Sequence, residues 1–287
     1  MELELLIIQA LNGISWGAIL FTVGAGFSLV FGFTDVVNLS HGSLYLLGAF
    51  VGLSVIEGTG NFLLGIIVGG ITTGIISVLM ERGLLRHLHG SVLRQVLLTA
   101  GFIYIFAGMI QRIWGTRPRI LAVPSILSGT IPLGVLRFPI YRLLIIGAGL
   151  LIFISLLLWL RKTRTGSIVR AGMDDEHMVE AMGVNLGIYF AAIFFIGGLL
   201  AGSAGVAAGP IVGLYLGLDV EILILALIIA VIGGIGSLEG AFLAAIIIGL
   251  IDSFGKAFFP SFAMFTVYFF LILVLMFRPS GFFGMRE

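Results

Sequence analysis

Cysteine is absent from the 287-residue sequence, and charged residues make up only 10% of it. Without cysteine the chain forms no disulfide, no thiolate metal site and no iron–sulfur cluster, and it has no cysteine nucleophile. The 15 basic and 14 acidic residues leave a net charge of +1, which excludes the clustered basic surface that nucleic-acid binding requires. So few charges cannot cover a soluble body of this size, so the chain needs lipid as its solvent.

Hydrophobic residues, in contrast, make up 60% of the sequence and fall into nine apolar runs. Because a helix needs about 20 apolar residues to cross a bilayer, these runs predict an all-α polytopic membrane bundle of about eight or nine transmembrane helices. Residues 1–287 then form a single transmembrane domain, with no room for a separate extramembrane domain. The runs cover residues 5–31, 44–56, 62–80, 95–113, 140–160, 186–208, 222–235, 241–258 and 262–277.

Charged residues between the runs set the expected orientation. Glu2 and Glu4 precede the first run, so we expect that run to be retained as a span, with the N-terminus on the non-cytoplasmic side. This order places nine of the fifteen basic residues in the cytoplasm, in loops 82–94 and 161–170 and in the tail with Arg278 and Arg286. Two runs separate the two loops, so both loops face the same compartment.

Small residues recur at every fourth position along several runs. Such stripes let helix backbones approach closely where no hydrophobic effect drives helices together in lipid. Packing within this chain is the expected role for each stripe, and packing on a partner subunit is the alternative. The stripes are Gly24, Ser28 and Gly32; Gly65, Gly69, Thr73 and Ser77; Gly197, Ala201, Gly205 and Gly209; and Ala241, Ala245 and Gly249.

A faint internal repeat predicts a transport path. A shift of about 180 residues superimposes two halves, 5–113 and 186–277, and pairs the two shortest runs, 44–56 and 222–235. An odd number of spans between the halves makes the repeats inverted, as in many transporters, where short or broken helices mark the substrate route. Polar breaks precede both short runs, and they supply the candidate path residues: Asn38, His41, Gly42, Gly209, Pro210 and Asp219.

Each ionisable residue near these breaks also has a purely structural interpretation. His41 either hydrogen-bonds to a passing solute or caps a broken helix end. Asp219 and Glu221 suit the first turn of a helix, where an acidic side chain meets the positive end of the dipole. Asp252 and Lys256 lie four residues apart, so they neutralise each other on one helix face. No P-loop and no histidine pair with metal-ligand spacing accompanies them.

The loop at residues 161–187 has a different character. Its four basic residues match ordinary anchoring at the membrane surface. Residues 174–183 then predict a short helix with an acidic first turn and a stop at Gly183, with methionines at 173, 178 and 182. A helix this short is marginal alone, so we expect it to dock on a surface outside this chain.

Seven segments together resemble the permease subunits of branched-chain amino acid ABC importers, most of all the shorter of their two permeases. The resemblance covers essentially the whole chain. In the general importer pattern, Glu-Ala-Ala is followed by a glycine six positions after the glutamate. Glu180 departs from this pattern, because it lies only three residues before Gly183. The resembling segments are Leu-Asn-Gly-Ile-Ser-Trp-Gly-Ala at 11–18, Gly-Phe-Ser-Leu-Val-Phe-Gly-Phe-Thr-Asp-Val-Val-Asn-Leu-Ser-His-Gly at 26–42, Leu-Gly-Ala-Phe at 47–50, the loop segments 164–171 and 182–185, the glycine turn at 233–240 and the end at 278–284.

The resemblance implies a non-catalytic subunit of the cell inner membrane that binds no cofactor itself. Its implied partners are a second homologous permease, two cytoplasmic ATPases that bind ATP, an extracytoplasmic substrate-binding protein and membrane lipid. The implied coupling-loop residues are Gly166, Arg170, Ala171, Met182, Gly183 and Asn185. The alternative is a stand-alone ion- or proton-coupled secondary transporter, and an intramembrane enzyme is a third class.

Overall fold

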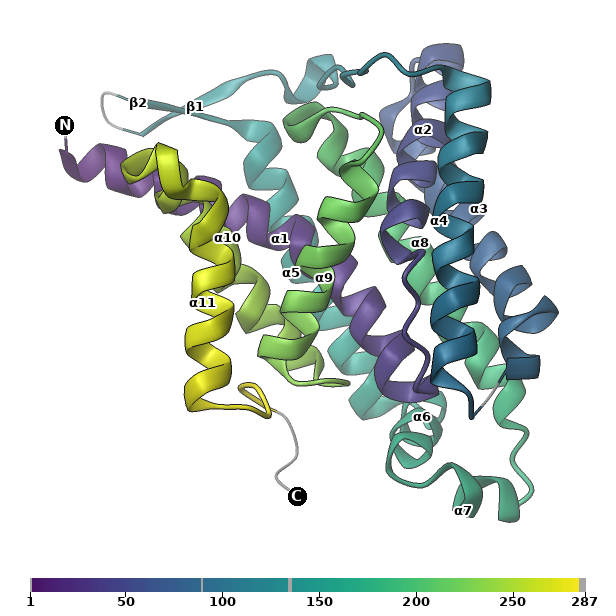
Figure 1. The fold of residues 1–287 in the computed structure, drawn as a ribbon. Helices are drawn as coiled ribbons and strands as arrows, with labels where there is room; N and C mark the ends of the chain where they lie inside the picture. Colours follow the sequence, from purple (N-terminus) through teal and green to yellow (C-terminus); the bar gives the residue numbers. More distant parts are fainter. Residues whose placement is uncertain (1, 89, 134–135, 284–287) are drawn as a thin grey trace.

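The computed structural model describes residues 2–88, 90–133 and 136–283. Nine long helices correspond to the nine apolar runs, so the expected polytopic helical membrane bundle is confirmed (Figure 1). Gly284 and Arg286, which entered the sequence argument, lie outside the described residues. The nine helices are α1 (Glu2–Thr34), α2 (His41–Thr59), α3 (Phe62–Gly83), α4 (Val92–Trp114), α5 (Ile140–Lys162), α8 (Leu186–Val212), α9 (Leu218–Gly233), α10 (Leu238–Phe258) and α11 (Ala263–Phe277).

Short elements connect the long helices. The α3–α4 connection contains the 3-10 turn η1 (Leu85–Leu88), and α5 leads into α6 (Arg164–Asp174) and α7 (Glu176–Ala181). The α4–α5 connection holds η2 (Ser125–Leu127) and an antiparallel hairpin of β1 (Thr130–Leu133) and β2 (Leu136–Pro139), in which Ile131 pairs with Phe138. The turn η3 (Pro260–Phe262) precedes α11. In Figure 1 the hairpin lies at one end of the bundle, and α6 and α7 lie at the other.

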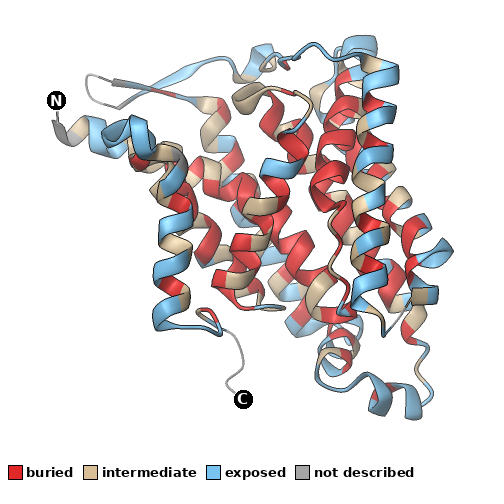
Figure 2. Ribbon diagram, in the orientation of Figure 1, coloured by how far each residue is buried: buried red, intermediate tan, exposed pale blue. Residues whose placement is uncertain are grey.

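Helix α1 runs through the centre of the bundle and packs on α10, α8, α9 and α5. Its Phe21, Ala25 and Phe27 are at most 1% exposed, whereas much of α4 and α11 is exposed (Figure 2), including large apolar residues such as Leu97 and Phe269. Across the described residues, seven helices are long and apolar enough to cross a membrane. Helices α9 and α11 have 16 and 15 residues, so each is shorter than the roughly 30 Å hydrocarbon layer.

Glycines bring the helix backbones into direct contact, as the small-residue stripes predict. A Cβ on Gly249 of α10 would overlap the backbone of Gly13 and Gly17 on α1, and one on Gly48 of α2 would overlap Gly202 of α8. The most extensive helix pairings are α3 with α8 and α1 with α10. A shift of about 180 residues superimposes α1 on α8 and α3 on α10, so it converts each of these two pairings into the other. The inverted repeat itself stays a prediction.

Two expected boundaries are wrong. Helix α2 has 19 residues instead of the 13 of its apolar run, because it begins at the polar His41 and ends only where Gly60 turns left-handed at φ 71°. Gly209 and Pro210 do not break the helix, since both belong to α8. This helix ends at Val212, before Gly213 at φ 77°.

Replacing Gly249 by Ala is expected to destabilise the bundle, because the new methyl group would push α1 from α10. Overpacking of this kind costs about 1–3 kcal/mol. The matched control is Gly147→Ala on α5, where an added Cβ meets nothing within 4 Å and alanine is the better helix former. Thermal unfolding in detergent should show a lower midpoint for Gly249→Ala alone; equal midpoints would contradict the close-packing argument.

Candidate functional site

The loop between α5 and α8 forms a short two-helix projection at one end of the bundle. The expected helix in this loop is present as α7, and Asp175 caps it by accepting a hydrogen bond of 2.9 Å from the Met178 N–H. Gly183 follows at φ 82°, as the glycine stop predicts. Helix α6 was not expected, although its buried Val169 and Gly172 repeat at helical spacing opposite a polar face.

Three of the six proposed coupling residues contact or cap a neighbouring helix, and the other three lie on the exposed surface of the projection. Gly166 is buried against the α5 backbone, and Arg170 donates from Nη1 to the Leu160 carbonyl oxygen at the end of α5. Asn185 caps α8 by accepting from the Gly187 N–H at 3.1 Å. Met182 is 78% exposed, and Ala171 and Gly183 are also exposed. Met178 extends this surface, since it is 60% exposed.

Helix α6 also touches the core of the bundle. A Cβ on Gly172 would overlap the Phe33 ring, and Gly32 and Gly236 both come within contact distance of the Met173 methyl group. Gly32 lies near the end of α1, and Gly236 lies in the turn between α9 and α10. A displacement of α6 would therefore act on α1 and on the turn that joins α9 to α10.

The two polar breaks meet inside the bundle. The Ser43 hydroxyl of α2 donates to Asp219 Oδ2 of α9 at 2.9 Å, and a Cβ on Gly42 would overlap the Asp219 carbonyl oxygen. Asp219 is 4% exposed and lies in the first turn of α9. The positive helix end and the Ser43 hydroxyl both stabilise its carboxylate. We call this contact the α2–α9 junction.

His41 and Asn38 lie beside this junction. The His41 ring is 1% exposed and its Nε2 lies 3.1 Å from the Val23 carbonyl oxygen. Asn38 Oδ1 accepts from the backbone and hydroxyl of Ser40, and its amide nitrogen has no partner among the residues the structure describes. Gly209 and Pro210 lie away from this junction, in α8, where Gly209 packs on Leu121 of the α4–α5 connection. Four of the six candidate path residues thus come together.

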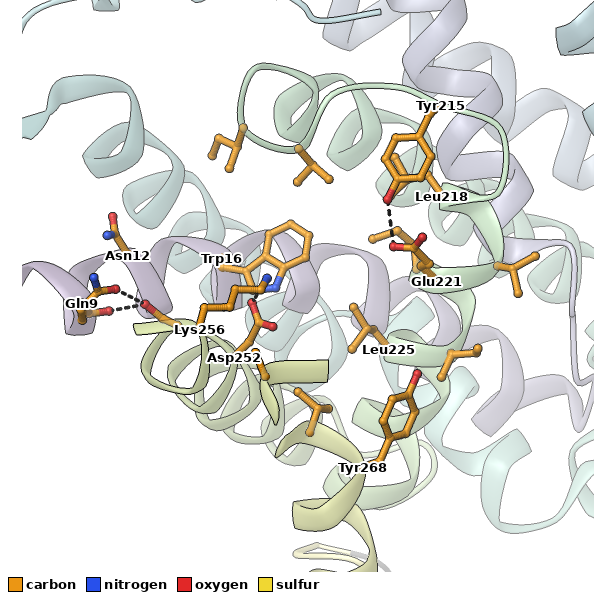
Figure 3. A pocket seen from close by; sticks show the side chains of 18 of the residues that line it. Gln9, Asn12, Trp16, Tyr215, Leu218, Glu221, Leu225, Asp252, Lys256 and Tyr268 are labelled. Atoms are coloured by element: carbon orange, nitrogen blue, oxygen red, sulfur yellow. Dashed lines mark hydrogen bonds and ion pairs between the residues drawn. The ribbon is translucent and has the colours of Figure 1, made fainter. Parts of the chain in front are cut away.

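A cavity of about 750 Å³ opens on the other face of α9. Figure 3 shows Glu221 on α9 facing Asp252 and Lys256 on α10, with Trp16 of α1 between them. None of the six candidate path residues lines it. Its polar lining comprises Gln9, Asn12, Arg142, Tyr215, Glu221, Asp252, Ser253, Lys256 and Tyr268.

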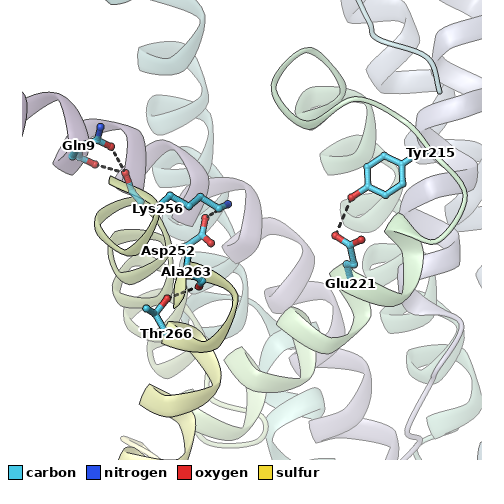
Figure 4. Close-up of polar contacts among 8 residues, drawn as sticks. Gln9, Tyr215, Glu221, Asp252, Lys256, Ala263 and Thr266 are labelled. Carbon is cyan, nitrogen blue, oxygen red and sulfur yellow. Dashed lines mark hydrogen bonds and ion pairs between the residues drawn. The ribbon is translucent and has the colours of Figure 1, made fainter. Parts of the chain in front are cut away.

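Hydrogen bonds hold this polar lining in place (Figure 4). Lys256 Nζ lies 2.6 Å from Asp252 Oδ2, as the i, i+4 spacing predicts, and the Ser253 hydroxyl donates to Gln9. The Tyr215 hydroxyl donates to Glu221 at 2.9 Å. Burial, and then the Glu221 hydrogen bond and charge, raise the pKa of Tyr215 to about 12, so it stays a donor at neutral pH.

Sequence reasoning missed most of this cavity. The sequence explains Glu221 as a first-turn helix charge and Asp252 and Lys256 as a mutually neutralising pair, and it does not indicate that Gln9, Asn12 and Arg142 line a cavity with them. Asn12 and Arg142 are 130 residues apart in sequence, yet Arg142 Nη1 donates to Asn12 Oδ1 at 2.6 Å. The available signal was their place inside otherwise apolar runs, where a polar side chain faces a cavity or a partner more often than lipid.

Fold and site together define a multi-pass helical membrane protein with a polar cavity and a helical projection at one end. Residues 9–277 match the family model described as the branched-chain amino acid transport system / permease component. The chain belongs to this family of transport permeases.

Curated relatives span nearly the same length. The high-affinity branched-chain amino acid transport system permease protein BraD of Pseudomonas aeruginosa is 28% identical, over 97% of this chain and 96% of the relative. The probable branched-chain amino acid transport permease protein LivH of Methanocaldococcus jannaschii is 24% identical over 84% and 78%. Among solved structures, PsaBC from Streptococcus pneumoniae in complex with Fab has the same fold, with a TM-score of 0.54 and 16% identity over 94% of this chain and 91% of that one.

The α2–α9 junction predicts different outcomes for two substitutions of Asp219. Asp219→Leu removes the acceptor of the buried Ser43 hydroxyl and should cost about 1–3 kcal/mol. Asp219→Asn keeps an acceptor oxygen of the same shape and should cost much less. Thermal unfolding of the purified protein measures both, and equal losses would show that the hydrogen bond to Ser43 contributes nothing.

Proposed function

We propose that the chain is the membrane-spanning permease subunit of an ABC importer that moves branched-chain or related amino acids across the cell inner membrane. It pairs with a second homologous permease, and two cytoplasmic ATPases supply ATP binding and hydrolysis. An extracytoplasmic substrate-binding protein delivers the amino acid. The chain itself is non-catalytic and alternates between outward and inward openings. Family membership and the names of the relatives support this assignment.

One observation carries the mechanical part of the proposal. The exposed Met178 and Met182 lie at the end of the projection, and α6 contacts the end of α1 and the turn between α9 and α10. Flexible methionine side chains suit a contact with a partner that moves. Closure of the two ATPases would press on α7 and shift α6. The shift would reach the bundle through Met173.

Met178→Asp with Met182→Asp should uncouple the importer. Both side chains are exposed, so the bundle should fold normally while a charged surface rejects an apolar partner. ATP-driven leucine uptake into vesicles and co-purification of the ATPases should both fall. The matched control is Ile126→Asp, which changes an 89% exposed residue in the α4–α5 connection. Unchanged uptake in the double variant would remove α7 from the coupling surface.

The path assignment of Asn38 and His41 predicts that alanine at both positions reduces uptake. The buried amide nitrogen of Asn38 supports it, because a water or polar solute would supply the missing partner. The measurement is leucine uptake, corrected for the amount of folded protein, in the reconstituted importer. Unchanged uptake would exclude both residues from the path.

A stand-alone secondary transporter is the second candidate. Buried ionisable groups within membrane spans, here Asp219 and His41, favour it because such groups often carry protons or ions. The purified chain alone would then take up amino acid on an imposed ion or proton gradient without ATP. The importer assignment predicts no uptake under that condition and uptake once partners and ATP are added.

A further inference from the structure

The cavity between α1, α5, α9, α10 and α11 carries charges that are costly to place in lipid. Arg142, Glu221, Asp252 and Lys256 all line it, on helices that are mostly apolar. Charged side chains at membrane depth face water, protein or a solute. The cavity is therefore a polar compartment, and its 750 Å³ is within the range of small-molecule sites.

Two of the four charged side chains that line the cavity neutralise each other, and the other two do not. Asp252 and Lys256 form an ion pair with each other. Glu221 accepts from the neutral hydroxyl of Tyr215, and Arg142 donates to the neutral amide oxygen of Asn12. Neither of these hydrogen bonds neutralises a charge. One anionic and one cationic group thus line the same cavity, each oriented by a neutral neighbour.

The rest of the lining is apolar. Ile222 and Leu225 come from α9, Val267 from α11 and Trp16 from α1. A ligand that suits this lining has a cationic group, an anionic group and an aliphatic part. The zwitterion of an aliphatic α-amino acid has all three, and it adds no net charge to the membrane interior.

We propose that this cavity binds the zwitterion of an aliphatic α-amino acid, with its ammonium group on Glu221, its carboxylate on Arg142 and its side chain against Leu225 and Val267. The assignment rests on the proposed function and adds the place and chemistry of the contact. A bound amino acid would bridge α9 to α5 and α11, which carry Arg142 and Val267. Glu221 and Arg142 are then specificity-determining residues of the transport path.

The absence of cysteine allows a direct test by single-cysteine labelling. The assembly of both permeases and both ATPases is placed in lipid nanodiscs without the binding protein, so that only the membrane subunits can hold the amino acid. Leu225→Cys puts a thiol in the cavity, and a water-soluble cationic methanethiosulfonate reports its accessibility. Millimolar L-leucine is expected to slow the labelling several-fold. Isopentylamine and 4-methylpentanoate, which lack the carboxylate and the ammonium group, should not.

Glu221→Gln in the same background should raise the leucine concentration needed for protection by about 10-fold or more, because it replaces a charge-assisted hydrogen bond by a neutral one. Ile126→Cys is the matched control, since that thiol should be labelled at the same rate with and without leucine. If Leu225→Cys does not fold, Val220→Cys serves instead, because it also lines the cavity and is 44% exposed.

Two outcomes would overturn the assignment: labelling that leucine does not slow, or equal protection by all three compounds. Either could occur while the complete importer still takes up leucine with ATP, and then the zwitterion site fails and the proposed function stands. If the complete importer takes up no amino acid with ATP, the proposed function fails. Leucine protection that Glu221→Gln removes would then still locate a zwitterion-binding cavity.

Discussion

Close contact between helix backbones is the constraint on which this structure depends. In lipid, apolar side chains gain nothing by leaving an already apolar solvent, so helices associate through packing and hydrogen bonds. Gly48 on Gly202 and Gly249 on Gly13 bring backbones together. Thr73 adds a hydrogen bond of 2.8 Å from α3 to the Gly198 carbonyl oxygen on α8. These contacts fix α1 and α8 in the interior and leave the more hydrophobic α11 outside.

The helices were easier to predict from the sequence than the contacts between them. Nine apolar runs predicted nine helices because an apolar segment in lipid must satisfy its backbone hydrogen bonds within itself, as a helix does. The stop at Gly183 and the Asp252–Lys256 pair were also predictable, since both are local. Helix boundaries at polar residues were not, because the carbonyl groups of Asn38 and Ser40 extend α2 beyond its apolar run.

Contacts between distant segments could not be predicted from one sequence. Ser43 and Asp219 are 176 residues apart, and Gln9 and Ser253 are 244 apart. Each residue has a local explanation of its own, as a cap or as a charge near a helix end, so nothing in its neighbourhood indicates its partner. The 180-residue shift does pair the starts of α2 and α9, but it says only that they correspond. Their direct contact depends on how the two halves pack.

Helix α9 connects the features that the proposed mechanism needs. Leu218, Glu221, Ile222 and Leu225 line the cavity on one of its faces, while Asp219 contacts α2 on another. At its far end the N–H groups of Phe282 and Phe283 donate to the Ile232 and Gly233 carbonyl oxygens, and Gly236 beyond them touches Met173 of α6.

At its beginning, Leu214 exchanges two backbone hydrogen bonds with Arg119 of the connection that carries the hairpin. A displacement at either end of the bundle therefore reaches the same helix. In the proposed mechanism, α9 tilts or shifts along α2. Movement of this one helix would open the α2–α9 junction and reshape the cavity in a single step, which is what alternating access requires.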